Sequence, residues 1–139
     1  MVRLLCGDCL DLMRDIPAGS VDMILCDLPY GITKNQWDRP LKLDKLWEQY
    51  SRIVKEHGAI CLFADGMFMA DLMKSNRKMW RYNLIWDKVI PTGFLNANRM
   101  PLRRTEEIAV FYRKQPLYHP MSVAKQVVLL CAANARLLM

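Results

Sequence analysis

The residues best suited to chemistry are the five from Asp27 to Gly31, which read Asp-Leu-Pro-Tyr-Gly and directly follow the apolar run 21–26. Such a run predicts a buried strand, and ligands of open α/β sheets bind at the carboxyl ends of strands. A carboxylate, a main-chain carbonyl and an aromatic ring suit a planar base that carries an exocyclic amine. Asp27 and the Leu28 carbonyl would each accept one amine hydrogen. Pro29 would stiffen the turn, and Tyr30 would stack on the base. The alternative interpretation is an ordinary turn that ends a strand.

The surrounding segments predict the elements that would position this turn. Apolar runs predict strands at 2–6, 21–26, 59–63, 82–86 and 107–112. Apolar spacing predicts a short helix or turn at 8–15 and helices at 43–54 and 66–77. His57 is expected in the last turn of the helix 43–54, and Gly58 is expected to end it. A loop is expected at 88–105. The alternation predicts an α/β fold with mostly parallel strands and flanking helices.

Composition narrows the class of protein. The chain has 139 residues, of which 53% are hydrophobic and 24% charged, so it has enough apolar side chains for one globular domain or a portion of one. Its five cysteines are an odd and modest count, which argues against a disulfide scaffold and favours a reducing, cytoplasmic location. No apolar run reaches the roughly 18 residues that a membrane span needs. No metal site is expected from the two histidines or from the Cys6 and Cys9 pair.

Charge is distributed unevenly along the chain. Residues 1–73 carry a net charge of −3, whereas residues 74–114 carry +7. A basic second half predicts a surface that meets a polyanion. A solvated lysine and arginine face is the alternative.

Asp27-Leu28-Pro29-Tyr30 resembles the Asp/Asn/Ser-Pro-Pro-Tyr signature of amino-group DNA methyltransferases, which use S-adenosylmethionine to methylate adenine N6 or cytosine N4. The segment 5–10, with Asp8 placed 19 positions before Asp27, is similar to a Gly-Asp strand end that contacts the cofactor adenosine. Further similarity covers 16–22, 34–38, 86–88, 92–101, 106–112 and 118–120. The sequence is most similar to phage and prophage enzymes in which the catalytic motif precedes the main cofactor motif.

The resemblance implies a partial Rossmann-like methyltransferase sheet, with a catalytic-motif portion at 1–120 and a divergent tail at 121–139. It implies S-adenosylmethionine as cofactor, bound by Asp8, Cys9 and Asp27. It implies that Asp27, Leu28, Pro29 and Tyr30 are the catalytic residues, because they match the signature position by position. Leu28 replaces the more usual proline, but the group needed there is a backbone carbonyl. Aspartate at the first position favours adenine N6.

The resemblance also implies double-stranded DNA as partner, because a base must be flipped out of the duplex to be reached. Candidate DNA-binding residues are Lys34, Trp37, Lys88, Thr92, Asn96, Asn98, Arg99, Arg103 and Arg104. A second copy of the chain, in a homodimer, is the other candidate partner.

The family's glycine-rich cofactor loop is not found in the sequence. We therefore expect the N-terminal portion of a longer enzyme, cropped or frameshifted near residue 122. The alternatives are an inactive DNA-binding remnant, or a methyltransferase for cytosine N4, an RNA base or a glutamine amide.

Overall fold

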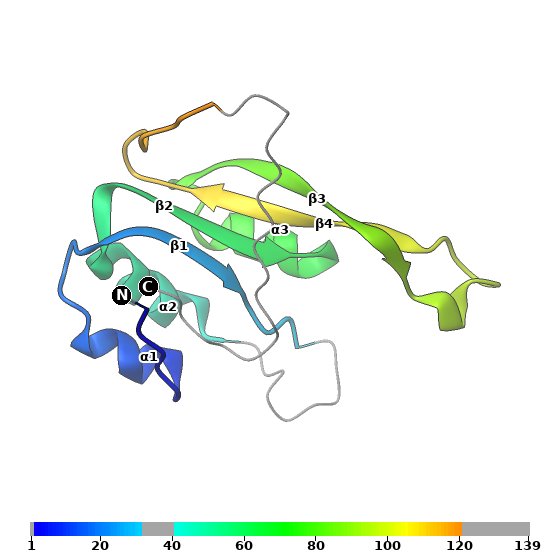
Figure 1. Ribbon diagram of the computed structural model, residues 1–139, viewed down its shortest axis with the longest axis horizontal. Coiled ribbons are helices and arrows are strands. Elements are labelled where there is room, and N and C mark those ends of the chain that lie inside the picture. The colour runs from blue at the N-terminus through cyan, green and yellow to red at the C-terminus, as the bar shows by residue number, and fades with distance from the viewer. Residues whose placement is uncertain (1, 32–40, 121–139) are drawn as a thin grey trace.

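The fold is built around a four-stranded sheet, seen in Figure 1. The computed structural model describes residues 2–31 and 41–120. The strands are β1 (Val21–Asp27), β2 (Val54–Ala64), β3 (Trp80–Thr92) and β4 (Arg103–Phe111), in the order β1-β2-β4-β3. The helices are α1 (Cys9–Leu12), α2 (Leu43–Ile53) and α3 (Gly66–Ser75), with short 3-10 turns η1 (Met13–Asp15) and η2 (Phe94–Asn96).

The sheet is mixed, so the prediction of mostly parallel strands was wrong. β1 and β2 are parallel, whereas β4 is antiparallel to both β2 and β3. β1 connects to β2 through α2, as a parallel pair requires. β3 and β4 are joined without a crossover helix, and a direct connection of this kind produces an antiparallel pair.

The apolar run 2–6 forms no strand, which corrects a second prediction. Val2 and Leu4 are exposed. Hydrophobic residues form a strand only where a neighbour takes up their backbone N–H and C=O groups. Within residues 2–31 and 41–120, β1 pairs only with β2, so nothing pairs with this segment.

One face of the sheet carries the main core. Alternate residues of β2, Ile60, Leu62 and Ala64, point to the same side as Phe111 and pack against the helices. The α2 residues in this core are Leu46, Trp47, Tyr50 and Ile53. Their spacing confirms the predicted amphipathic helix. The intervening strand residues Cys61, Ile108 and Val110 form a smaller cluster on the other face.

The helix α2 matches the predicted range 43–54 to within one residue, but the prediction of Gly58 as its stop was wrong. It stops at Ile53, and the chain turns directly into β2 at Val54. His57 and Gly58 therefore lie in the strand rather than at a helix end. Gly58 sits where the register of β1 and β2 shifts, and a Cβ there would lie 2.8 Å from the Asp22 carbonyl oxygen. The glycine permits this close approach of the two backbones.

β3 and β4 continue beyond the rest of the sheet as a projecting arm, formed by residues 87–105 (Figure 1). β2 contacts β4 only from Glu107 to Phe111. The predicted loop at 88–105 therefore contains strand at both ends, and its tip is the turn η2. Val89 has a φ of 65° where the register shifts between Asp87 and Thr92, which is a conformation that β-branched residues rarely adopt. None of the helices in the described segments is long and apolar enough to cross a membrane.

Candidate functional site

Asp27 is the last residue of β1, at the carboxyl end of the sheet. The Tyr30 hydroxyl donates a hydrogen bond of 3.0 Å to Asp27 Oδ1. Leu28 is buried in the main core, and Pro29 is half-buried. The buried leucine anchors the turn, so that Asp27 and Tyr30 are held on its outer side. The structure thus brings together the four residues of the predicted catalytic motif.

A residue that the sequence analysis missed, Phe68 of α3, supports the tyrosine. The rings of Tyr30 and Phe68 are stacked, with centroids 5.2 Å apart and planes inclined by 26°. Offset stacking of this kind is favourable and restricts the orientation of both rings. No periodic pattern in the sequence indicates this contact, because it joins a loop to a helix residue 38 positions away.

The environment perturbs both members of the hydrogen-bonded pair. Partial burial raises the pKa of Asp27, and the negative charge of Glu106 adds to that rise, while the hydrogen bond from Tyr30 opposes it. Burial and the neighbouring Asp27 carboxylate raise the pKa of Tyr30 well above its usual range. The Tyr30 hydroxyl, which is protonated at neutral pH in any case, thus remains a donor to Asp27 in alkaline solution as well.

Two further acidic residues lie toward this end of the sheet. Asp65 directly follows β2 and forms an ion pair of 2.7 Å with Arg103. Glu106, on β4, is paired with Lys88 at 2.9 Å, and both side chains are largely shielded from solvent. Asp65 could have been found from sequence, because it follows an apolar strand as Asp27 does, and parallel neighbouring strands end at the same edge.

Most predicted DNA-binding residues lie on the arm. The cations at its base are held in ion pairs, which join Lys88 to Glu106, Arg103 to Asp65 and Arg104 to Asp87. Thr92 accepts a hydrogen bond from Lys88 Nζ. Asn96, Asn98 and Arg99 are exposed at the tip, and Arg99 has no ion pair with any residue in 2–31 or 41–120. Lys34 and Trp37 lie outside the described residues.

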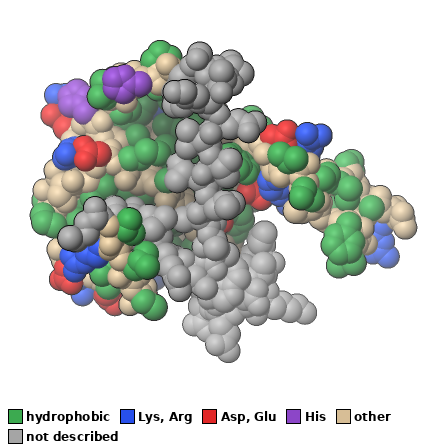
Figure 2. Space-filling model, in the orientation of Figure 1, with side chains coloured by type: hydrophobic (Ala, Val, Ile, Leu, Met, Phe, Trp, Pro, Cys, Tyr) green, Lys and Arg blue, Asp and Glu red, His purple; other side chains and the backbone are tan. Residues whose placement is uncertain are grey.

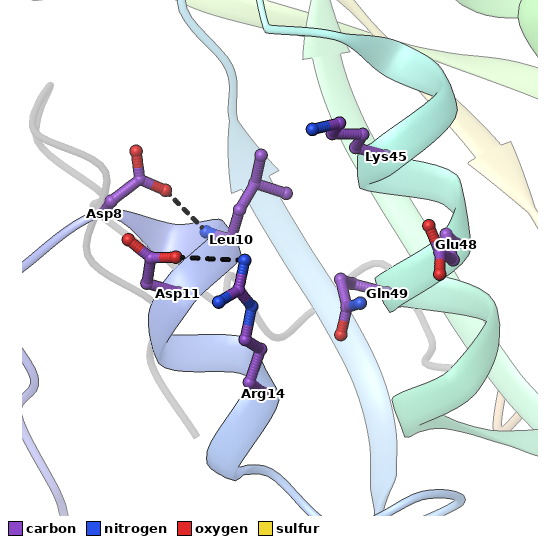
Figure 3. A pocket seen from close by; sticks show the side chains of 7 residues that line it. All are labelled: Asp8, Leu10, Asp11, Arg14, Lys45, Glu48 and Gln49. Carbon is purple, nitrogen blue, oxygen red and sulfur yellow. Dashed lines mark hydrogen bonds and ion pairs between the residues drawn. The ribbon is translucent and has the colours of Figure 1, made fainter.

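The two other predicted cofactor residues, Asp8 and Cys9, lie at the start of α1. Asp8 caps this short helix through a 2.8 Å hydrogen bond from the Leu10 N–H to its Oδ1. The Cys9 thiol is half-buried beside the core, and this burial raises its pKa. Asp8 lines a polar cavity of about 400 Å³ between α1 and α2, seen in Figure 3. The other lining residues are Leu10, Asp11, Arg14, Lys45, Glu48 and Gln49.

Asp27 is not among the residues that line this cavity, so the predicted cofactor residues fall into two separate places. Within the described segments, no three histidine, cysteine or acidic side chains gather as a metal site would require.

Two curated proteins that are similar in sequence to this chain are named as methyltransferases. Type II methyltransferase M.BglII of Bacillus subtilis is 30% identical over 131 residues, covering 81% of this chain and 35% of that protein. DNA adenine methyltransferase YhdJ of Escherichia coli K12 is 31% identical over 91 residues, covering 58% of this chain and 31% of that protein. The chain thus spans about a third of the length of these curated relatives.

Solved structures show the same fold. The complex of M1.HpyAVI with SAM superposes with a TM-score of 0.64 at 16% identity, covering 92% of this chain and 63% of that one. The cytosine-N4-specific PvuII DNA methyltransferase gives 0.62 at 12% identity, covering 79% of this chain and 49% of that one. The model of the N6/N4 methylase family, described as DNA methylase, matches residues 21–128. By this match over most of its length, the chain belongs to the N6/N4 DNA methylase family.

Proposed function

We propose that this chain carries the target-amine site of a DNA methyltransferase, that S-adenosylmethionine is the methyl donor, and that the target is N6 of adenine. The observation that carries the proposal is the Asp27 carboxylate at the end of β1. It accepts a hydrogen bond from Tyr30, whose ring is itself stacked on Phe68. An aspartate at this position and the YhdJ relative, named as an adenine methyltransferase, support adenine.

In this proposal Asp27 and the Leu28 carbonyl accept the two hydrogens of the exocyclic amine. Tyr30 occupies Asp27 Oδ1, whereas Oδ2 has no hydrogen-bond partner among the described residues. One oxygen therefore fixes the carboxylate and the other is available to the amine. Two acceptors in fixed positions orient the nitrogen lone pair toward the electrophile, and this preorganisation lowers the barrier to transfer.

Tyr30 serves as the stacking surface for the flipped base. Because one face of its ring is covered by Phe68, the base would stack on the opposite face. A tyrosine hydroxyl is protonated at neutral pH, and the raised pKa of Tyr30 extends its role as a donor to Asp27 into more alkaline solution. Phe68 is a positioning residue in this scheme, because it acts on the base only through Tyr30.

The cavity beside Asp8 fits one portion of the cofactor. Its volume lies within the range of small-molecule sites, and it combines carboxylates with Arg14 and Lys45. Asp8 Oδ2 is not used by the cap and has no hydrogen-bond partner in residues 2–31 and 41–120, so it can accept from a ribose or adenine group. S-adenosylmethionine supplies the methyl group when it is bound. The role of Cys9 stays a prediction.

DNA binding is proposed for the arm. Between residues 88 and 105 the chain has four cations and no acidic residue, which suits a phosphate backbone. The ion pairs of Lys88, Arg103 and Arg104 hold the base of the arm, so these three would share their charge between the protein and DNA. Arg99 is the cation best placed to contact phosphate directly.

Transfer of tritium from labelled S-adenosylmethionine to duplex DNA tests the function. We expect Asp27→Ala to lower transfer by about 100-fold or more, as loss of one preorganised polar group in an active site does. Asp22→Ala is the matched control, because Asp22 is an exposed aspartate of the same strand, and its transfer should stay within about twofold of wild type. Identification of the methylated base separates adenine N6 from cytosine N4.

Absence of transfer by the unaltered chain would contradict the proposed activity. Salt-sensitive DNA binding without S-adenosylmethionine binding would then support the inactive remnant. That the chain is one portion of a longer enzyme stays a prediction.

A further inference from the structure

The arm exposes apolar side chains that the proposed phosphate contacts do not use. The large ones are Val89, Ile90, Phe94, Leu95, Met100 and Leu102. Figure 2 shows hydrophobic side chains along the outer part of the arm, with lysine or arginine side chains among them. Exposed apolar side chains gathered on one projection, with charged groups around them, mark an interaction site.

The tip that bears these residues has a defined shape. The Asn96 N–H donates to the Gly93 carbonyl at 2.9 Å, and the Arg99 N–H donates to the Asn96 carbonyl at 2.8 Å. These bonds close the turn η2 and hold Phe94 and Leu95 outward, 74% and 85% exposed. A tip that is already ordered loses little conformational freedom when it binds.

The charge distribution of the arm favours DNA as its partner. The cations of the arm lie mainly at its base, and its acidic partners Asp87 and Glu106 also lie there. Beyond Asp87 the arm carries only positive and uncharged groups. This arrangement is complementary to a duplex, in which phosphates lie outside and apolar base faces lie inside.

The arm is also connected to the candidate site. Its base residue Arg103 is paired with Asp65, which directly precedes α3, and Phe68 of α3 is stacked on Tyr30. From Asp87 the seven residues to Phe94 reach up to roughly 23 Å when extended. A major groove is about 8.5 Å deep, which lies well within this upper limit.

We propose that Phe94 and Leu95 form an apolar wedge that enters the base stack of DNA bound at the Asp27 site. The inference rests on the proposed function, because a flipped base leaves a gap in the stack that must be filled or closed. Apolar side chains inserted between bases replace part of the lost stacking. The wedge would therefore stabilise the opened duplex while the amine is held by Asp27.

The test compares the affinity of the full chain for two duplexes of identical sequence, one intact and one with a central abasic site. No recognition sequence is needed, because the abasic duplex already contains the gap. We expect the unaltered chain to bind the abasic duplex at least about fivefold more tightly. The double variant Phe94→Ala and Leu95→Ala should lose this preference and keep the salt dependence, since its phosphate contacts remain.

A second double variant, Leu117→Ala and Tyr118→Ala, is the matched control. These residues are as exposed as the wedge, at 83% and 74%, but lie outside the arm. They should keep the preference for the abasic duplex. Circular dichroism verifies that both double variants are folded.

Three results would overturn the wedge. In the first, the unaltered chain binds both duplexes equally; in the second, the arm variant keeps the preference. In the third, sedimentation shows a dimer that the arm variant alone abolishes, which makes the tip a contact between copies of the chain. Each leaves Asp27-dependent methyl transfer untouched, whereas failure of the proposed function is loss of that transfer itself.

Discussion

The body of the sheet and its arm use the same residue types in opposite ways. In the body, β2, α2 and the end of β4 bury their aromatic and aliphatic side chains in one core. In the arm, β3 and β4 have no covering helix and expose theirs. Hydrophobic residues in the body therefore hold the fold together, whereas those of the arm are available to a partner. Five changes test this contrast, from the largest expected effect to the smallest.

Phe111→Ala should lower the free energy of unfolding by about 3–5 kcal/mol, because the phenyl ring is fully buried 4.7 Å from the ring of Trp47. Leu95→Ala, on the arm, should change it by less than about 0.5 kcal/mol. Urea denaturation measures both. Similar losses in the two variants would contradict the division between body and arm.

Arg52→Ala should lower the free energy of unfolding by about 2–3 kcal/mol. Its guanidinium donates hydrogen bonds of 2.7 Å to the Ile16 carbonyl and 2.6 Å to the Met13 carbonyl, so it ties α2 to the segment that precedes β1. Denaturation of this variant and of Arg52→Lys provides the measurement. Lysine keeps the charge but cannot donate to both carbonyls in the same way. If lysine restored full stability, charge rather than the bidentate geometry would be the cause.

Lys88→Met should destabilise the junction between arm and body by about 1–2 kcal/mol, because it leaves the largely shielded Glu106 carboxylate without its partner. Lys55→Met removes the more exposed ion pair with Asp22 and should lower the free energy of unfolding by less than about 1 kcal/mol. Amide hydrogen exchange should show the loss of protection in β3 and β4 for Lys88→Met alone. Equal losses of stability in the two variants would contradict the difference between the shielded and the exposed ion pair.

Asp27→Asn should slightly raise the melting temperature at pH 7. The corresponding gain in the free energy of unfolding should be less than about 1 kcal/mol, because the carboxyl group remains partly solvated. Its folded pKa is raised, mainly by burial, so the stability it contributes is present in acid and is lost as pH rises through that pKa. The advantage of asparagine should therefore disappear below about pH 3.9, where the unfolded chain is also protonated. Thermal melts across this pH range measure it.

Asp87→Asn is the comparison of opposite sign. Hydrogen bonds from Arg104 and from the Val89 N–H lower the pKa of Asp87, so it contributes stability at neutral pH that is lost as pH falls. At neutral pH, Asp87→Asn should therefore lower the melting temperature. Two shifts of the same sign would refute the proposed electrostatic contrast.

The local elements of the body could be predicted from the sequence, and the arm could not. The spacing of Leu46, Trp47, Tyr50 and Ile53 predicted α2, because a helix shows its buried face every three to four residues. The residue expected to end that helix was wrong, because Gly58 serves a close contact between two strands. Proline, glycine and asparagine at 88–105 indicated a loop, although cross-strand pairing extends β3 and β4 into it.

The candidate site shows the same division. The motif from Asp27 to Tyr30 was recognisable because its residues are contiguous and follow an apolar run. Phe68 and Glu106 were missed, since their proximity to it depends on how separate strands and a helix pack, whereas Asp65 was missed although its place after an apolar strand could have indicated it. The ion pairs of Lys88, Arg103 and Arg104 were also missed, because charge counts do not show which acid each cation meets.

The sequence by itself determined the main local features of this protein: the amphipathic α2, the strand β1 and the chemically suited turn after it. These depend on periodicity and on contiguous residues, which act over a few positions. Only the tertiary structure decided the antiparallel placement of β4, the projection of the arm and the stacking of Phe68 on Tyr30. These result from hydrogen bonds and packing between segments distant in the chain, whose partners no local pattern specifies.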